Sequence, residues 1–139
     1  MNRAQEMLNT HPNPANVETR LLAETVSALH NCVLTCTSCA DACLAEPMVD
    51  ELVRCIRLNL DCSDVCHTTA ELLSRQTEPD WSLIGDQLRA CATACHTCGN
   101  ECERHADMHE HCRICAEACR HCEQMCNQML EAIPSGAMA

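Results

Sequence analysis

Apolar and cysteine side chains recur every three or four residues along most of this chain, with polar residues between them. Steps of three and four return to the same side of an α-helix. The repeat is clearest from 112 to 126, where cysteines are separated by 3, 4, 3 and 4 positions and no glycine or proline interrupts. This segment is predicted to be a helix with a stripe of thiols along one side, formed by Cys112, Cys115, Cys119, Cys122 and Cys126.

Three earlier segments carry similar stripes, and each follows a proline. Pro14, Pro47 and Pro79 favour the first position of a helix, because the N–H group that proline lacks is not needed there. Asp107, followed three residues later by Glu110, resembles a capping box that begins the last helix. The predicted helices span residues 14–45, 47–75, 79–105 and 107–133.

These helices define the predicted fold and domain organisation. Their connections are very short, which favours antiparallel neighbours and therefore an all-α, up-down-up-down four-helix bundle with a cysteine-lined core. Residues 13–134 are expected to form this bundle. Residues 1–12 are expected to be an N-terminal extension with a short helical turn, and residues 135–139 a flexible tail.

The stripes place cysteine at one end of the bundle and leucine at the other. The helices at 14–45 and 79–105 carry their cysteines in their C-terminal halves, and the other two carry theirs in their N-terminal and middle parts. In this topology all the cysteines lie toward the same end. The core is therefore predicted to be a column of sulfur that opens at that end, here called the mouth, beside Met48, His105, Met108 and His109. The opposite end is predicted to be an apolar plug made of Leu21, Leu22, Leu73, Ile84, Leu88, Leu130 and Ile133.

The amino-acid composition indicates that the cysteines form part of the hydrophobic core. The chain has 16 cysteines but no phenylalanine or tyrosine, so buried thiols must act as small hydrophobic side chains. The 20 acidic residues outnumber nine arginines, for a formal charge of −11, which argues against nucleic acid as a partner. The sequence shows no secretory signal, no twin arginine and no apolar run of membrane-spanning length. A cytoplasmic protein is expected, in which cysteines stay reduced and more often bind metal.

Thiolate ligands favour Cu(I), zinc or iron–sulfur clusters. A structural zinc site needs four converging ligands, and the cysteine run of bacterial ferredoxins is absent. Cu(I) accepts two or three ligands and a thiolate can bridge two ions, so capacity is on the order of one copper per cysteine. The favoured function is storage of many Cu(I) ions without catalysis. The alternatives are a zinc or iron–sulfur protein and a thiol redox or regulatory protein.

The cysteine pattern over nearly the whole chain resembles that of the copper storage proteins, in particular the cytosolic branch that lacks a signal peptide. This resemblance implies a four-helix bundle filled with Cu(I), a tetrameric assembly, and copper storage or detoxification without catalysis. The expected partners are copper ions and a copper chaperone or a low-molecular-weight thiol. His105 and His109 match histidines that this family places at the mouth, and Asn59 matches an asparagine in the second stripe, as a hydrogen-bonding residue or a weak ligand. His111 is near the mouth but off the stripe, and it is predicted to be on the surface. The predicted metal ligands are Cys32, Cys36, Cys39, Cys43, Cys55, Cys62, Cys66, Cys91, Cys95, Cys98, Cys102, Cys112, Cys115, Cys119, Cys122, Cys126, His105 and His109, with Met48, Met108 and Asn59 as weaker candidates.

Overall fold

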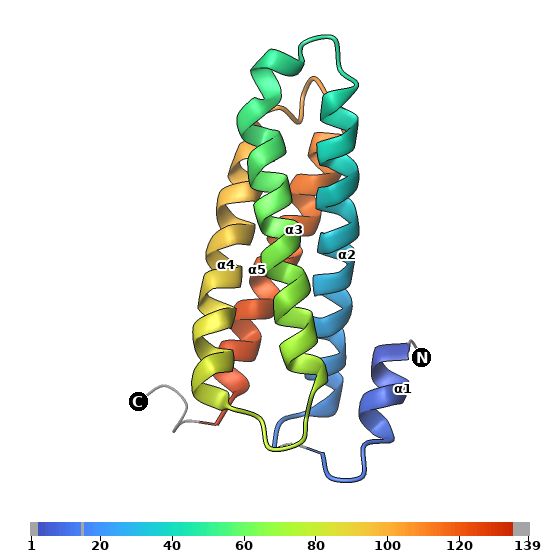
Figure 1. The fold of residues 1–139 in the computed structure, drawn as a ribbon, viewed down its shortest axis with the longest axis vertical. Coiled ribbons are helices and arrows are strands. Elements are labelled where there is room, and N and C mark those ends of the chain that lie inside the picture. Colours follow the sequence, from blue (N-terminus) through green and yellow to red (C-terminus); the bar gives the residue numbers. More distant parts are fainter. Residues whose placement is uncertain (1–2, 15, 135–139) are drawn as a thin grey trace.

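The structure is a computed structural model that describes residues 3–14 and 16–134. Four long helices form the bundle and a short one lies beside it (Figure 1). Neighbouring pairs are α2 with α3, α3 with α4, α4 with α5 and α5 with α2, which confirms the all-α, up-down-up-down bundle. The elements are α1 (Arg3–Asn9), α2 (Thr19–Leu44), the 3₁₀ helix η1 (Val49–Leu52), α3 (Val53–Ser74), α4 (Trp81–Arg104) and α5 (Glu110–Ala132).

The prolines lie before the helices rather than at their first positions, so these predicted starts were wrong. The first long helix begins at Thr19 instead of Pro14, and Pro47 lies in a turn that precedes η1. Pro79 comes just before Asp80, whose carboxylate accepts a hydrogen bond from the N–H of Leu83 at 3.1 Å and so caps α4. Proline prevents a helix from extending upstream through it, but it does not determine how soon the next helix begins.

The predicted capping box at the start of the last helix is also absent. The N–H groups of Met108 and His109 both donate to the carbonyl oxygen of His105, at 3.2 and 3.0 Å, so Asp107 still lies in a turn. His109 occupies the N-cap position of α5 without a side-chain cap. Glu110 is the first residue of α5, and its carboxylate pairs with Arg113.

The short helix α1 lies in the segment where a helical turn was expected, and packs beside the plug end of α2 (Figure 1). Leu8 is its buried residue and joins the hydrophobic core. The predicted tail at 135–139 lies outside the described residues. Among the helices that the structure describes, none has an apolar stretch of the length needed to cross a membrane.

An apolar plug fills the end of the bundle away from the mouth, as predicted. Leu22, Leu73, Ile84, Leu88 and Ile133 are buried there, and Leu21 and Leu130 pack against them while partly exposed. Thr25 and Thr69 are also buried, and each hydroxyl donates to the carbonyl oxygen four residues earlier at 2.8 Å. These bonds satisfy the polar atoms that would otherwise be costly in an apolar environment.

Gly99 allows α4 and α5 to lie close together. A Cβ atom at this position would lie 3.3 Å from the Cβ of Cys119 and 3.1 Å from Nη1 of Arg120. Such contacts are tight, so a side chain here would require Cys119 and Arg120 of α5 to shift by a few tenths of an ångström. The glycine therefore helps to hold the thiols of the two helices within reach of each other.

Candidate metal site

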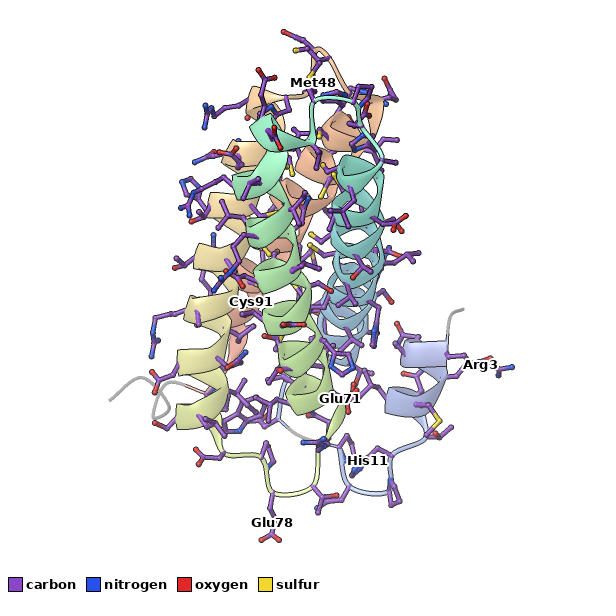
Figure 2. All side chains as sticks on the ribbon, turned by 45° about the horizontal axis from the view of Figure 1, so that its top comes forward. Arg3, His11, Met48, Glu71, Glu78 and Cys91 are labelled. Atoms are coloured by element: carbon purple, nitrogen blue, oxygen red, sulfur yellow. The ribbon has the colours of Figure 1, made fainter. Side chains whose placement is uncertain are left out.

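All 16 cysteines are free thiols that point into the bundle, with exposed fractions of 0–1%. Their sulfur atoms form a column between the four long helices (Figure 2). Sγ–Sγ distances below 4 Å join α2 to α3, α3 to α4 and α2 to α5. The distance is 3.9 Å between Cys32 and Cys62, 3.8 Å between Cys62 and Cys95, and 3.7 Å between Cys36 and Cys119. These lengths are close enough for metal bridging but far beyond a disulfide bond of about 2 Å.

The thiols gather into groups that could each hold a metal ion, with all ligand atoms of a group within 4.8 Å of one another. Three of these groups consist of four cysteines and follow one another along the column. They are Cys32, Cys66, Cys95 and Cys122; Cys32, Cys36, Cys62 and Cys119; and Cys36, Cys98, Cys115 and Cys119. Because Cys32, Cys36 and Cys119 each belong to two groups, the arrangement is a continuous network of shared ligands rather than a row of separate sites.

Hydrogen bonds between neighbouring thiols shift their pKa values in opposite directions along the column. Hydrogen bonds with Cys115 and Cys119, together with burial, raise the pKa of the Cys36 thiol. Hydrogen bonds with Cys122 and Cys91, again with burial, raise the pKa of Cys126 at the plug end. Hydrogen bonds with Cys119 and Cys122 lower the pKa of the Cys32 thiol, and hydrogen bonds with Cys102 and Cys112 lower that of Cys39. Burial opposes ionisation at each of these thiols, and a cation that binds a protonated thiol displaces its proton.

Asn59 lies fully buried within the column, at the position where a cysteine would continue the stripe of α3. Its Oδ1 accepts hydrogen bonds from the thiols of Cys98 at 3.0 Å, Cys115 at 3.1 Å and Cys102 at 3.4 Å. Its Nδ2 donates to the sulfur of Cys55 at 3.7 Å. The amide is thus satisfied by four cysteines, which favours the hydrogen-bonding interpretation. Its use as a weak copper ligand stays a prediction.

The predicted mouth residues meet at the connections between α2 and η1 and between α4 and α5. Met48 lies half-buried at this end of the bundle (Figure 2), while Met108 is 64% exposed. His105 is largely buried, and its Nε2 lies 3.0 Å from a carboxylate oxygen of Glu101. His109 is buried, with Nδ1 3.2 Å from Oε2 of Glu46. Its Nε2 is buried too, and no described residue forms a hydrogen bond with it.

His111 lies near the mouth, as expected, but it is only 25% exposed and contacts the thiols rather than lying on the surface. Its Nδ1 lies 3.4 Å from the sulfur of Cys39 and 3.6 Å from that of Cys112, and its Nε2 lies 2.8 Å from Glu46. With Cys39, Cys43 and Cys112 it forms a further group able to hold a metal ion. Because α2 ends at Leu44, no further turn of that helix covers this side of α5. A side chain next to the stripe can therefore reach the sulfurs.

The imidazoles of His109 and His111 both contact the carboxylate of Glu46. The rings of His109 and His111 are stacked, with centroids 5.5 Å apart. The hydrogen bond from His111 is the main reason that the pKa of Glu46 is lowered. Burial opposes protonation of His111, but hydrogen bonds with Cys39 and Glu46 outweigh it and raise the pKa of the imidazole.

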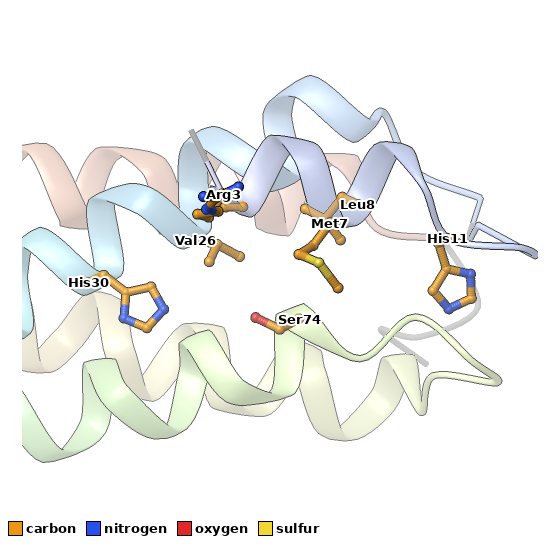
Figure 3. A pocket seen from close by; sticks show the side chains of 8 residues that line it. Arg3, Met7, Leu8, His11, Val26, His30 and Ser74 are labelled. Atoms are coloured by element: carbon orange, nitrogen blue, oxygen red, sulfur yellow. The ribbon is translucent and has the colours of Figure 1, made fainter. Parts of the chain in front are cut away.

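A hollow lies on the flank of the plug end, between α1, α2 and α3 (Figure 3). Its volume is about 360 Å³. Its lining includes Met7, Leu8, His11, Val26, His30 and Ser74, and it contains no cysteine. The hollow is therefore separate from the column of thiols.

Comparisons with known proteins agree with this geometry. The chain is 48% identical to the copper storage protein Ccsp of Streptomyces lividans, whose structure was solved loaded with 10 copper equivalents. The match covers 94% of this chain and 99% of that one, with a TM-score of 0.92. Cu(I)-bound BsCsp3 is 30% identical, over 79% of this chain and 98% of its own, with a TM-score of 0.71. The cysteine-rich protein YhjQ of Bacillus subtilis is 34% identical over 90 residues, which is 65% of this chain and 78% of YhjQ. The sequence model of the copper storage proteins matches residues 18–131, and the chain belongs to the copper storage protein family.

Proposed function

We propose that this protein stores many Cu(I) ions on the thiolates that line its core, without catalysing a reaction. The observation that carries the proposal is the meeting of sixteen buried thiols from four helices in one column, where Cys32, Cys36 and Cys119 are each shared by two groups able to hold a metal ion. Soft thiolate ligands favour Cu(I), and a shared sulfur can bridge two ions. The copper-loaded structures of the two relatives support the same function for this chain.

The charge balance of the column explains how it can hold so many cations. Each Cu(I) ion that binds displaces the proton of a neutral thiol, so the core gains no net charge as it fills. Uncompensated charges in this buried environment would be very costly. A sulfur that belongs to two groups can serve two ions, so we expect a capacity on the order of one copper per cysteine.

Titration of the reduced, metal-free protein with Cu(I) under anaerobic conditions tests this function. A chelator that forms a coloured Cu(I) complex would report the free ion once the protein is full. We expect the chelator to remain colourless until about one equivalent per cysteine has been added. Saturation at two to four equivalents would contradict storage, and a brown protein as purified would favour the iron–sulfur alternative.

We further propose that copper passes through the mouth, with His105 and His109 as ligands and with Met48 and Met108 as weaker contacts. The buried, unpartnered Nε2 of His109 supports this path because it offers a free nitrogen donor at the end of the sulfur column. Replacing both histidines with alanine should slow loading and leave most of the capacity intact. His96→Ala is the matched control, because His96 is exposed on α4 and pairs with Glu123. Loss of nearly all capacity in the double variant would show that the mouth assignment is wrong.

Cytoplasmic location and tetrameric assembly are also part of the proposal. The Streptomyces relative is described as a cytosolic copper storage protein, which supports the same location for this chain. Leu34, Val53 and Leu60 are 67%, 63% and 45% exposed on α2 and α3, and they are candidates for subunit contacts. Light scattering during size-exclusion chromatography should show a tetramer that Leu34→Asp weakens. A monomeric wild-type protein would contradict the assembly.

A further inference from the structure

Glu46 lies in the connection between α2 and η1. Its carboxylate contacts two histidines: His109, which is the N-cap residue of α5, and His111, which lies in α5. One oxygen, Oε2, lies 3.2 Å from Nδ1 of His109 and 2.8 Å from Nε2 of His111. The backbone at Glu46 is itself fixed, because its N–H donates to the carbonyl oxygen of Cys43 at 3.2 Å. The carboxylate therefore reaches across the mouth from a part of the chain that closes the end of α2.

These contacts determine which nitrogen of each ring carries a proton. A neutral imidazole has one N–H donor and one acceptor nitrogen, and a carboxylate can only accept. In its neutral form, His109 must therefore place its proton on Nδ1, and neutral His111 must place its proton on Nε2. The remaining nitrogens, Nε2 of His109 and Nδ1 of His111, are then left with lone pairs.

The positions of these remaining nitrogens suit a metal ion. Nδ1 of His111 lies beside the sulfurs of Cys39 and Cys112, in a group that could hold an ion with Cys43. Nε2 of His109 is buried, and within the described part of the chain no donor reaches it. A buried acceptor without a partner costs free energy, which a ligand that binds there would recover. The carboxylate is a poor ligand for Cu(I), which favours sulfur and imidazole nitrogen.

We propose that Glu46 is the positioning residue of the mouth: it accepts the N–H groups of His109 and His111 and so leaves the opposite nitrogens free to bind Cu(I). The inference rests on the proposed storage function, because it assigns the residue that prepares the same site for its ions. Metal-binding histidines commonly depend on such an acceptor for ring orientation, and its loss typically weakens affinity or activity roughly 10- to 100-fold.

The test begins with the metal-free, reduced protein. Long-range ¹H–¹⁵N correlation spectra at fixed neutral pH identify the protonated nitrogen of each histidine ring. We expect the wild-type protein to show His109 protonated on Nδ1, the tautomer that free histidine disfavours. In Glu46→Ala this tautomer should be lost. In Glu46→Gln it should be retained, because the amide oxygen can still accept. Glu51→Ala, at an exposed position in η1, is the control and should resemble the wild-type protein.

Uptake of Cu(I) from a coloured chelator complex provides the second measurement. Glu46→Ala should slow uptake at least several-fold and leave final capacity unchanged, while Glu46→Gln should retain most of the wild-type rate. The proposal is overturned if Glu46→Ala keeps the Nδ1 tautomer and the wild-type rate. It is also overturned if the glutamine variant is as defective as the alanine variant, since charge rather than hydrogen bonding would then matter. Failure of the wild-type protein to bind many ions would instead contradict the storage function, independently of the tautomers.

Discussion

Replacing Leu88 with alanine is expected to destabilise the metal-free protein without lowering its copper capacity. Leu88 is fully buried in the plug, three residues before the first cysteine of α4. The substitution removes three carbon groups at about 0.8 kcal/mol each, or roughly 2.4 kcal/mol of transfer free energy. The cavity that remains adds to this, so we expect a total loss of about 3 to 4 kcal/mol. For a chain of this size, the melting temperature should fall by roughly 10 °C.

The assay is thermal unfolding of the reduced, metal-free variant, followed by circular dichroism, together with an anaerobic Cu(I) titration. Leu83→Ala is the matched control, because Leu83 is on the same helix but is 51% exposed. It should change stability by no more than about 0.5 kcal/mol. If the two variants were equally stable, the plug would not be the part of the core that holds the helices together. If Leu88→Ala lost several copper equivalents, the plug and the column would not be independent.

Three further predictions concern the column and the helix ends. Cys119→Ala removes a sulfur that two groups share. This variant should lose more Cu(I) capacity than Cys126→Ala, which removes a sulfur at the plug end. Equal losses in the titration would argue against shared ligands. Loading should release about one proton per ion, because a protonated thiol loses its proton when it binds Cu(I) and because the pKa of thiols such as Cys36 is raised. Apparent affinity should therefore rise with pH, and an indicator dye that detects far fewer protons would show that the thiols were already ionised. Asp80→Ala removes the cap of α4 and should cost about 1 kcal/mol in urea unfolding; an unchanged midpoint would contradict the cap.

The repeat of three and four residues was sufficient to predict the bundle and the inward direction of the cysteines. This repeat depends only on helix geometry, and it is long enough in each segment to define one face. It also placed Leu88 and Ile133 at the opposite end from the mouth, where the structure has them. The direction of a side chain follows from periodicity wherever the helix itself is certain.

The helix ends and the mouth were harder to predict because they depend on contacts without periodicity. The start of α5 is set by two N–H groups that share the carbonyl oxygen of His105, and no residue type signals that turn. The position of His111 beside Cys39 depends on where α2 ends. Glu46 lies in the connection between α2 and η1, outside the helical repeat, so the repeat does not predict where its side chain points. Its role becomes visible only when the distances to the two imidazoles are known.

The plug gives the column a dead end, with buried Leu29, Leu73, Leu88 and Met129 beyond the last sulfurs. Ions that bind early would lie deepest in the column, next to the plug, and ions that bind last would lie nearest the mouth. An external chelator should then withdraw copper in the reverse order of its delivery. A heavy copper isotope supplied in the last portion should be recovered first, because the depth of an ion in the core would reflect the order in which it was bound.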